Sequence, residues 1–139
     1  MKFEEVRKDL FTVGEDYYLA HCVSSCLAMG AGIAVSMNAK FGLREALRAS
    51  GKSLDHPTCV LTGRVFNMIT KQMSCDKPLV GDFTASLYKM KELAVENGVK
   101  KIAMPRIGCG LDRLKWDGVC ESIQKCFAKT DIEVLVCWQ

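Results

Sequence analysis

The sequence predicts an α/β protein, a three-layer α/β/α sandwich with a mixed central sheet, in which one domain covers residues 1–139. Short apolar runs of strand length alternate with segments of helical periodicity, which favours a mostly parallel sheet covered by helices. A hairpin in the middle of the chain adds an antiparallel pair, and two glycine turns follow predicted strands. In such sheets ligands bind beyond the carboxyl ends of the strands.

The elements follow from local patterns in chain order. Strands are predicted over 18–23, 58–61, 65–71, 101–104 and 132–138. Helices are predicted from the first glycine turn to about residue 41, over a short segment around 43–47, over 82–97, and along an apolar stripe from 116 to 127. The turn around Gly63 joins the second and third strands, and Gly98 ends the third helix in the usual position.

Composition limits the class of protein. A chain of 139 residues is long enough to bury roughly two-thirds of its unfolded surface without disulfides. Apolar residues make up 49% and charged residues 25%, as in ordinary globular proteins. The net charge of +3 includes no run of five like charges, so no nucleic-acid-binding arm is expected. No signal peptide or membrane span is evident, so we expect a soluble, intracellular protein.

The cysteines do not have the spacing of a metal site. There are eight cysteines, but no C-x-x-C pair, and there are only two histidines, His21 and His56. Most of the cysteines are therefore interpreted as small buried side chains with reduced thiols, and His21 as a buried residue at the end of a strand. We expect no metal and no cofactor, and a cytosolic or nuclear protein.

The most informative segment is 105–112, which reads Pro-Arg-Ile-Gly-Cys-Gly-Leu-Asp and follows the strand over 101–104. The absence of side chains at Gly108 and Gly110 would let a diphosphate approach the main chain, where successive amides can form an anion-binding nest. The segment ends on the carboxylate of Asp112. A simpler interpretation is a tight connection to a helix, with Asp112 as its N-cap or paired with Arg113.

A second glycine element strengthens the case for a ligand site. The residues Met-Gly-Ala-Gly-Ile-Ala at 29–34 open a segment in which Ile33, Met37 and Phe41 fall on one helical face. A glycine turn that enters a helix N-terminus can bind an anion through free N–H groups and the helix dipole. Two such elements in one small chain indicate two walls of a nucleotide site.

Five ordered segments carry a resemblance to a known family. They are Asp9-Leu10-Phe11, Leu19-Ala20-His21-Cys22, 29–34, Ile69-Thr70-Lys71 and 104–116. In combination they resemble a macrodomain, the ADP-ribose-binding fold, and more narrowly its terminal ADP-ribose protein glycohydrolase branch. The resemblance extends from about Phe3 to Trp138.

This resemblance implies an enzyme. Members of that branch remove ADP-ribose from mono-ADP-ribosylated proteins in which it is esterified to glutamate or aspartate, and related members deacylate O-acetyl-ADP-ribose. The implied catalytic pair is Lys71 as the nucleophile and Asp112 as the acid/base. ADP-ribose and ADP-ribosylated proteins are the implied partners, with nucleic acid only as ADP-ribosylated DNA and with no membrane partner. A monomer is expected for so small a domain.

The two residue types suit this chemistry. A neutral lysine amine can attack the anomeric carbon of the distal ribose, or its open-chain aldehyde, to form an imine-type adduct. A neighbouring carboxylate can then move protons and activate water. An ordinary lysine has a pKa near ~10.4, so less than roughly 0.1% of its amine is neutral at pH 7. An unplaced lysine is usually a solvated one, and it is the family position of Lys71 that indicates catalysis.

The resemblance also implies the binding residues. Asp9 would accept a hydrogen bond from the adenine amino group and Leu10 would line the adenine pocket. The remaining implied ligand-binding residues lie along the diphosphate and distal ribose: Ser24, Gly32, Ile33, Ala34, Thr70, Pro105, Ile107, Gly108, Cys109, Gly110 and Leu111. Family members commonly place glycine before the aspartate at position 9, whereas this chain has Lys8.

Two alternatives from other classes stay open. The first is a reader module that binds ADP-ribose without chemistry, and the second is a hydrolase acting on ADP-ribosylated DNA. The presence of both Lys71 and Asp112 favours an enzyme over a reader. The modest charge of +3 argues against DNA, which a basic stripe beside the cleft would favour.

Overall fold

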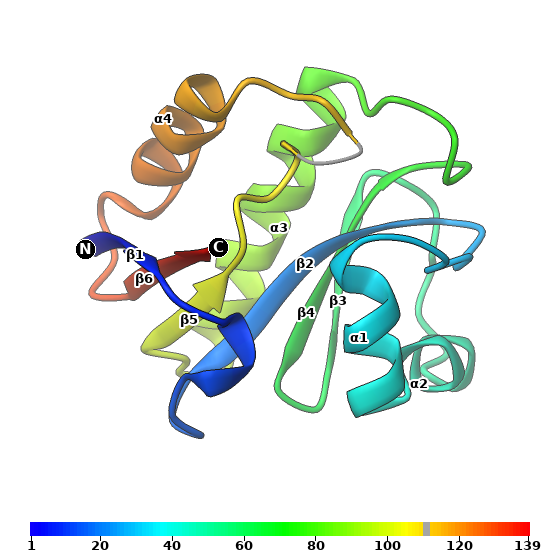
Figure 1. The fold of residues 1–139 in the computed structure, drawn as a ribbon, viewed down its shortest axis with the longest axis horizontal. Helices are drawn as coiled ribbons and strands as arrows, with labels where there is room; N and C mark the ends of the chain where they lie inside the picture. The colour runs from blue at the N-terminus through cyan, green and yellow to red at the C-terminus, as the bar shows by residue number, and fades with distance from the viewer. Residues whose placement is uncertain (110–111) are drawn as a thin grey trace.

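The computed structural model describes residues 1–109 and 112–139 (Figure 1). Within these residues one sheet has the strand order β1-β6-β5-β2-β4-β3. Its strands are β1 (Lys2–Arg7), β2 (Tyr18–Ser24), β3 (Thr58–Thr62), β4 (Val65–Lys71), β5 (Lys101–Met104) and β6 (Glu133–Trp138). The helices are η1 (Leu10–Thr12, a 3-10 helix), α1 (Ile33–Phe41), α2 (Leu43–Ala49), α3 (Val80–Glu96) and α4 (Trp116–Phe127).

The sheet is mixed, as predicted. Strands β3 and β4 pair antiparallel, and the other neighbouring strands pair parallel. The hairpin between β3 and β4 turns at Gly63, whose φ of +56° favours glycine. Strand β4 is buried at every position, as expected for a strand with helices on both faces.

Two apolar cores lie on opposite faces of this sheet and define the three layers. One core holds buried side chains of α3 and α4, including Phe83 and Phe127. The other holds those of α1 and α2, including Met37 and Leu47. Figure 1 shows α1 and α2 on the other side of the sheet from α3. The predicted α/β/α sandwich is therefore confirmed.

The connections leave a crevice between β2 and β5. These strands are parallel neighbours, but after β2 the chain crosses through α1 and α2 toward β3 and β4, whereas after β5 it crosses through α4 to β6. Such a reversal of direction separates the loops beyond the carboxyl ends of the two strands. The segments 25–32 and 72–79, which follow β2 and β4, and the described residues 105–109 and 112–115, which follow β5, therefore meet at one edge of the sheet.

Two differences from the sequence-based expectation have a clear physical reason. Strand β1 was not predicted, because its sequence is charged and only Phe3 and Val6 are partly buried. It is an edge strand that pairs with β6 on one side. Helix α3 begins at Val80 rather than residue 82, since its N-cap residue Leu79 makes no side-chain capping bond that the sequence could signal.

His21 is buried as expected, but fewer cysteines are buried than expected, since four are partly exposed and Cys75 is exposed. All eight cysteines are free thiols, of which Cys59, Cys126 and Cys137 are buried. His21 is fully buried in β2, and its Nε2 lies 2.7 Å from Oδ1 of Asn67 in β4. In the described residues no three histidine, cysteine or acidic side chains gather as metal ligands would. None of the described helices has the length and apolarity to cross a bilayer.

Candidate active site

A cavity of about 590 Å³ lies at the carboxyl ends of β2, β4 and β5. Nine of the predicted site residues line it: Ser24, Gly32, Ile33, Ala34, Lys71, Pro105, Ile107, Gly108 and Asp112. They come from three separate segments of the chain. The crevice that the topology predicts is thus the place where the two glycine elements and the lysine meet.

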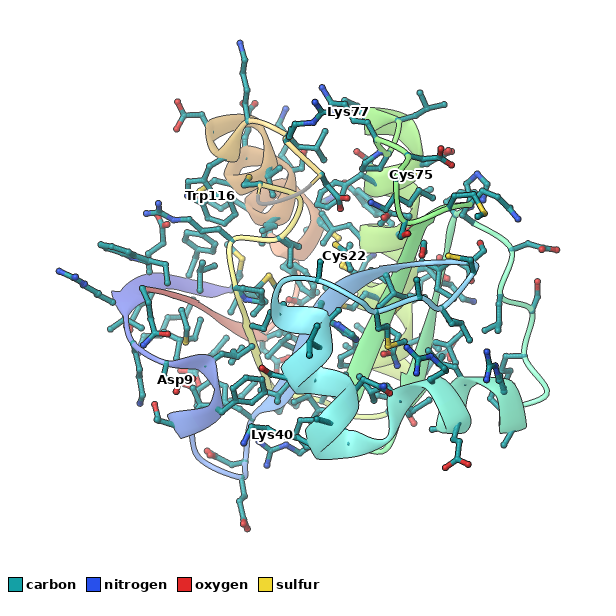
Figure 2. All side chains as sticks on the ribbon, turned by 45° about the vertical axis from the view of Figure 1, so that its right-hand side comes forward. Asp9, Cys22, Lys40, Cys75, Lys77 and Trp116 are labelled. Carbon is teal, nitrogen blue, oxygen red and sulfur yellow. The ribbon has the colours of Figure 1, made fainter. Side chains whose placement is uncertain are left out.

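A second cavity, of about 360 Å³, continues from the first. It is lined by Asp9 and Leu10, and it shares Ile33, Pro105 and Arg106 with the larger cavity. Figure 2 shows Asp9 and Cys75 far apart, with Cys22 between them. Because Cys22 and Cys75 line the larger cavity, the two cavities form one elongated groove that runs from Asp9 toward Cys75.

Lys71 and Asp112 form an ion pair at the far end of this groove. Nζ of Lys71 donates to Oδ1 of Asp112 at 2.5 Å and to the carbonyl oxygen of Ser74 at 2.9 Å. The lysine and aspartate side chains are only 10% and 12% exposed. Asp112 is therefore not the N-cap of α4, a place taken by Lys115. The carboxylate lies at the end of β4, in direct contact with the amine of Lys71.

The segment after β2 runs alongside the end of β4. The pairing of the two strands shifts register between Val23 and Ser24. Beyond this bulge, the N–H of Ser25 donates to the carbonyl of Lys71 at 2.8 Å, and that of Cys26 donates to the carbonyl of Gln72 at 3.0 Å. These bonds hold the buried Ser24 beside Lys71.

Gly32 makes the turn into α1. Its φ of +62° and ψ of −153° lie in a region that is open almost only to glycine. Gly32 is the N-cap of α1 and offers no side chain to accept the first N–H groups of the helix. Because Gly32, Ile33 and Ala34 line the cavity, these N–H groups are available to an anion there.

Gly108 is required by two constraints. Its φ is +77°, and a Cβ at this position would lie 2.9 Å from Cδ1 of Leu114 and 3.2 Å from Cε2 of Phe83. The carbonyl of Gly108 accepts a hydrogen bond from the N–H of Leu114 at 2.7 Å, which closes the loop. Glycine is favoured here both by the positive φ and by the close approach of Leu114 and Phe83.

Arg106 joins the two parts of the groove. Its guanidinium carbon lies 4.7 Å from the ring centre of Trp138 and 5.7 Å from that of Trp116. Nε lies 3.6 Å from a carboxylate oxygen of Glu5, which also accepts a 2.9 Å hydrogen bond from the Trp116 indole. Trp116 is partly exposed, and its indole N–H has the Glu5 carboxylate as a polar partner. These contacts hold a positive charge on the groove wall.

Some predicted residues are not in the groove. Thr70 is fully buried and does not line either cavity, because it precedes Lys71 in β4 and successive strand side chains point to opposite faces. Cys109 is partly buried outside the cavity lining, and burial raises the pKa of its thiol. Gly110 and Leu111 lie outside the described residues.

Other residues line the groove although they were not among the predicted site residues. The carbonyl of Ser74 accepts from Lys71, and Cys75 lines the mouth of the cavity, although the segment after β4 has no recognisable pattern. Cys22 also lines the cavity, and burial raises the pKa of its thiol, with the Asp112 carboxylate adding to the effect. At the opposite end, Lys8 lines the cavity of Asp9, and its N–H donates to the carbonyl of Trp138 at 2.9 Å.

The same fold occurs in known structures. The macrodomain of Mycobacterium tuberculosis DarG superposes with a TM-score of 0.84 at 17% identity, covering 99% of this chain and 97% of the other. Thermosipho africanus DarTG in complex with ADP-ribose superposes with a TM-score of 0.79 at 19% identity, covering 99% of this chain and 42% of that one. At these identities the similarity establishes the fold.

Sequence comparison identifies nearer relatives. ADP-ribose glycohydrolase OARD1 of Homo sapiens is 42% identical over 133 residues, which cover 94% of this chain and 88% of the relative. The Bos taurus protein of the same name is 41% identical with the same coverage. Residues 20–123 match the Macro domain family. The chain therefore belongs to the macrodomain family, as its ordered motifs predicted.

Proposed function

We propose that this protein is an ADP-ribosyl hydrolase that releases ADP-ribose from glutamate and aspartate side chains of modified proteins. The ion pair between Lys71 and Asp112 at the end of the groove carries the proposal, because it joins a nucleophile and a proton acceptor in one shielded place. Relatives of similar length named ADP-ribose glycohydrolase support it. A macrodomain neighbour described in complex with ADP-ribose supports the choice of ligand.

The groove can accommodate the three parts of ADP-ribose in order. The adenine would lie in the smaller cavity beside Asp9 and Leu10. The diphosphate would lie between the turns at Gly32 and Gly108, where backbone N–H groups and a helix N-terminus favour negative charge. The distal ribose would then reach Lys71, and the modified side chain would leave past Cys75.

The proposed reaction begins with a proton transfer within the ion pair. Asp112 takes a proton from Nζ of Lys71, which leaves a neutral amine and a carboxylic acid. The amine attacks the anomeric carbon of the distal ribose, the bond from that carbon to the ester oxygen breaks, and the protein carboxylate departs. Asp112 then serves as the acid and base for water, which displaces the lysine and frees ADP-ribose.

The same site could also hydrolyse small esters of the distal ribose. Asp112 would take a proton from a water molecule that attacks the acyl carbon, the bond from that carbon to the ribose oxygen would break, and the ribose hydroxyl would take the proton as acetate is released. We therefore propose deacylation of O-acetyl-ADP-ribose as a second reaction of this site, with Asp112 as the acid and base.

The test is release of free ADP-ribose from a glutamate-modified protein by the wild type, Lys71→Ala and Asp112→Ala. Lys77→Ala is the matched control, since Lys77 is an exposed lysine on the segment after β4. We expect loss of release in both site variants, normal release by the control, and an adduct of ADP-ribose on Lys71 of Asp112→Ala by mass spectrometry. Tight binding of ADP-ribose without release by the wild type would instead indicate a reader module.

A further arm of the assay addresses the leaving group. The same proteins are offered ADP-ribosylated DNA and O-acetyl-ADP-ribose. Release from DNA at a rate above that from the modified protein would overturn the assignment to protein substrates. Release from both carboxylate esters, with DNA left intact, supports it.

A further inference from the structure

The wall of the groove between β2 and α1 has an unusual backbone. Leu27 and Met29 have φ values of +56° and +44°, and Gly32 has +62°. Residues other than glycine rarely adopt this left-handed conformation, because their Cβ atom clashes with the backbone. Contacts with neighbouring residues must therefore hold Leu27 and Met29 in it. Ala28, Met29, Gly30 and Ala31 all line the larger cavity, so the shape of this wall decides how the groove meets its ligand.

One side chain from a distant helix holds this segment. Arg44, in α2, donates from Nε to the carbonyl oxygen of Leu27 at 2.8 Å and from Nη2 to that of Ala28 at 2.5 Å. Its own N–H donates to Oδ1 of Asn38 in α1 at 2.9 Å, which fixes the start of α2 against α1. The two carbonyls thus face one guanidinium, whose planar fork suits two acceptors side by side.

The direction of these carbonyls fixes the direction of the next amide. In a trans peptide the C=O and the following N–H point in opposite directions. With the carbonyl of Ala28 turned to Arg44, the N–H of Met29 points away from the guanidinium. Arg44 does not line the cavity, whereas Met29 does. The arginine therefore orients a backbone donor from behind the wall.

The charge of Arg44 also favours an anion in the groove. Within residues 1–109 and 112–139 no carboxylate oxygen lies within ion-pair distance of its guanidinium. It is partly buried behind a groove whose expected ligand carries a diphosphate. A positive charge in that place favours an anion, and hydrogen bonds from a charged donor are stronger than neutral ones.

We propose that Arg44 is a positioning residue of the ADP-ribose site, which holds the 27–32 segment in the conformation that binds the diphosphate. The inference rests on the proposed ligand and not on the proposed hydrolysis. It predicts that loss of Arg44 weakens binding and raises KM, while the chemistry at Lys71 and Asp112 continues.

The experiment compares Arg44→Ala and Arg44→Lys with Arg48→Ala, a matched control because Arg48 is exposed in the last turn of the same helix. Calorimetry with ADP-ribose measures Kd, and steady-state release measures KM and kcat. We expect Arg44→Ala to raise Kd and KM by about tenfold with kcat changed less than threefold. Arg44→Lys should recover only part of the lost affinity, because a lysine ammonium keeps the charge but lacks the planar guanidinium that donates to both carbonyls.

A second readout separates positioning from general stability. Amide hydrogen exchange should accelerate at 27–32 in Arg44→Ala, while exchange in α3 and at 105–109 stays unchanged. An unchanged Kd, or equal effects of Arg44→Ala and Arg48→Ala, would overturn the proposal. If Arg44→Ala does not fold, Arg44→Lys provides the same comparison. If the wild type binds ADP-ribose but does not release it from modified protein, the proposed hydrolysis is wrong. The proposal for Arg44 is then still tested by the effect of Arg44→Ala on Kd.

Discussion

Nζ of Lys71 lies 2.5 Å from Oδ1 of Asp112, a residue that follows it by 41 positions in the chain. This contact ties the loop after β5 to the end of β4 across the intervening strand β2. The pair is shielded, since both side chains are about nine-tenths buried. Its members therefore depend on each other for stability as well as for the proposed chemistry.

Removing either member should destabilise the fold. Asp112→Ala leaves the Lys71 ammonium with the Ser74 carbonyl as its remaining bond, and we expect the free energy of unfolding to fall by about 2 kcal/mol. Lys71→Ala leaves the Asp112 carboxylate without its ion-pair partner and should cost about the same. The double variant should cost less than the two single variants together, because neither charge is then left alone.

Urea denaturation of the four proteins measures this coupling. The control is the cycle of Lys100→Ala and Asp131→Ala, because that ion pair of 2.9 Å is well exposed and should show no measurable coupling. Strictly additive effects of Lys71→Ala and Asp112→Ala would contradict the expectation that the two charges depend on each other.

Gly108→Ala should be far more damaging than an alanine at other positive-φ glycines. The new Cβ would lie 2.9 Å from Leu114 and 3.2 Å from Phe83, in addition to the strain at a φ of +77°. Gly98 has a φ of +66° with open space around it, so Gly98→Ala meets only the backbone strain, at about 1 kcal/mol. We expect Gly108→Ala to lower the free energy of unfolding by about 3 kcal/mol, and to weaken ADP-ribose binding as well. Equal losses in the two variants by thermal denaturation would refute the steric argument.

The sequence predicts most of this fold because its signals are local. The period of the apolar residues locates α3 and α4, and Gly63 marks the hairpin. Strand β1 escaped prediction because an edge strand needs few apolar side chains, and only Phe3 and Val6 are partly buried. Its partner β6 lies at the other end of the chain, so no local pattern records the pairing.

The site residues, too, could be predicted only where the signal is local. Lys71 and Asp112 were predicted from motifs that sit at strand ends, and parallel strands bring such ends together. Thr70 was chosen from the same motif, but strand alternation directs it away from the groove. Arg44 carried no signal, because an arginine on a helix surface can reach many places. Its bonds to the 27–32 segment depend on how α2 packs.

Cys26 should be the most readily modified of the partly buried thiols. Its Sγ lies 3.1 Å from the hydroxyl of Ser24. The pKa of Cys26 is lowered by the hydrogen bond from Ser24 first, and then by the backbone N–H groups of Ala28 and Ser74. The thiolate is the reactive form, so its fraction at neutral pH exceeds that of an ordinary cysteine. Burial instead raises the pKa of Cys22 and should protect it.

Alkylation by iodoacetamide, followed by peptide mass spectrometry between pH 6 and 9, tests this order. The experiment is done in Cys75→Ser, which removes the exposed thiol. We expect Cys26 to react well before Cys22, and Ser24→Ala to move the midpoint of the Cys26 reaction to higher pH. A midpoint that stays in place in Ser24→Ala would show that the hydroxyl does not stabilise the thiolate.

His21 should make the protein less stable in acid. Burial lowers its pKa from 6.5 to about 4, although the hydrogen bond with Asn67 opposes the shift. Between these values the unfolded chain binds a proton that the folded protein excludes, so the free energy of unfolding falls as the pH falls. The loss is complete only below the folded pKa. From pH 7 to pH 5 it amounts to about 2 kcal/mol, at 1.36 kcal/mol for each unit below 6.5.

The measurement compares urea unfolding of the wild type, His21→Gln and His56→Gln at pH 7 and pH 5. His21→Gln replaces the titrating ring by a neutral amide, and its loss of stability between the two pH values should be about 2 kcal/mol smaller than that of the wild type. His56 is the matched control, because it is the other histidine and lies partly exposed beside Asp82. His56→Gln shows what the replacement of a histidine by glutamine does at a partly exposed position. If His21→Gln lost as much stability between pH 7 and pH 5 as the wild type does, the loss would be caused by other groups, such as the carboxylates. The prediction for His21 would then be wrong.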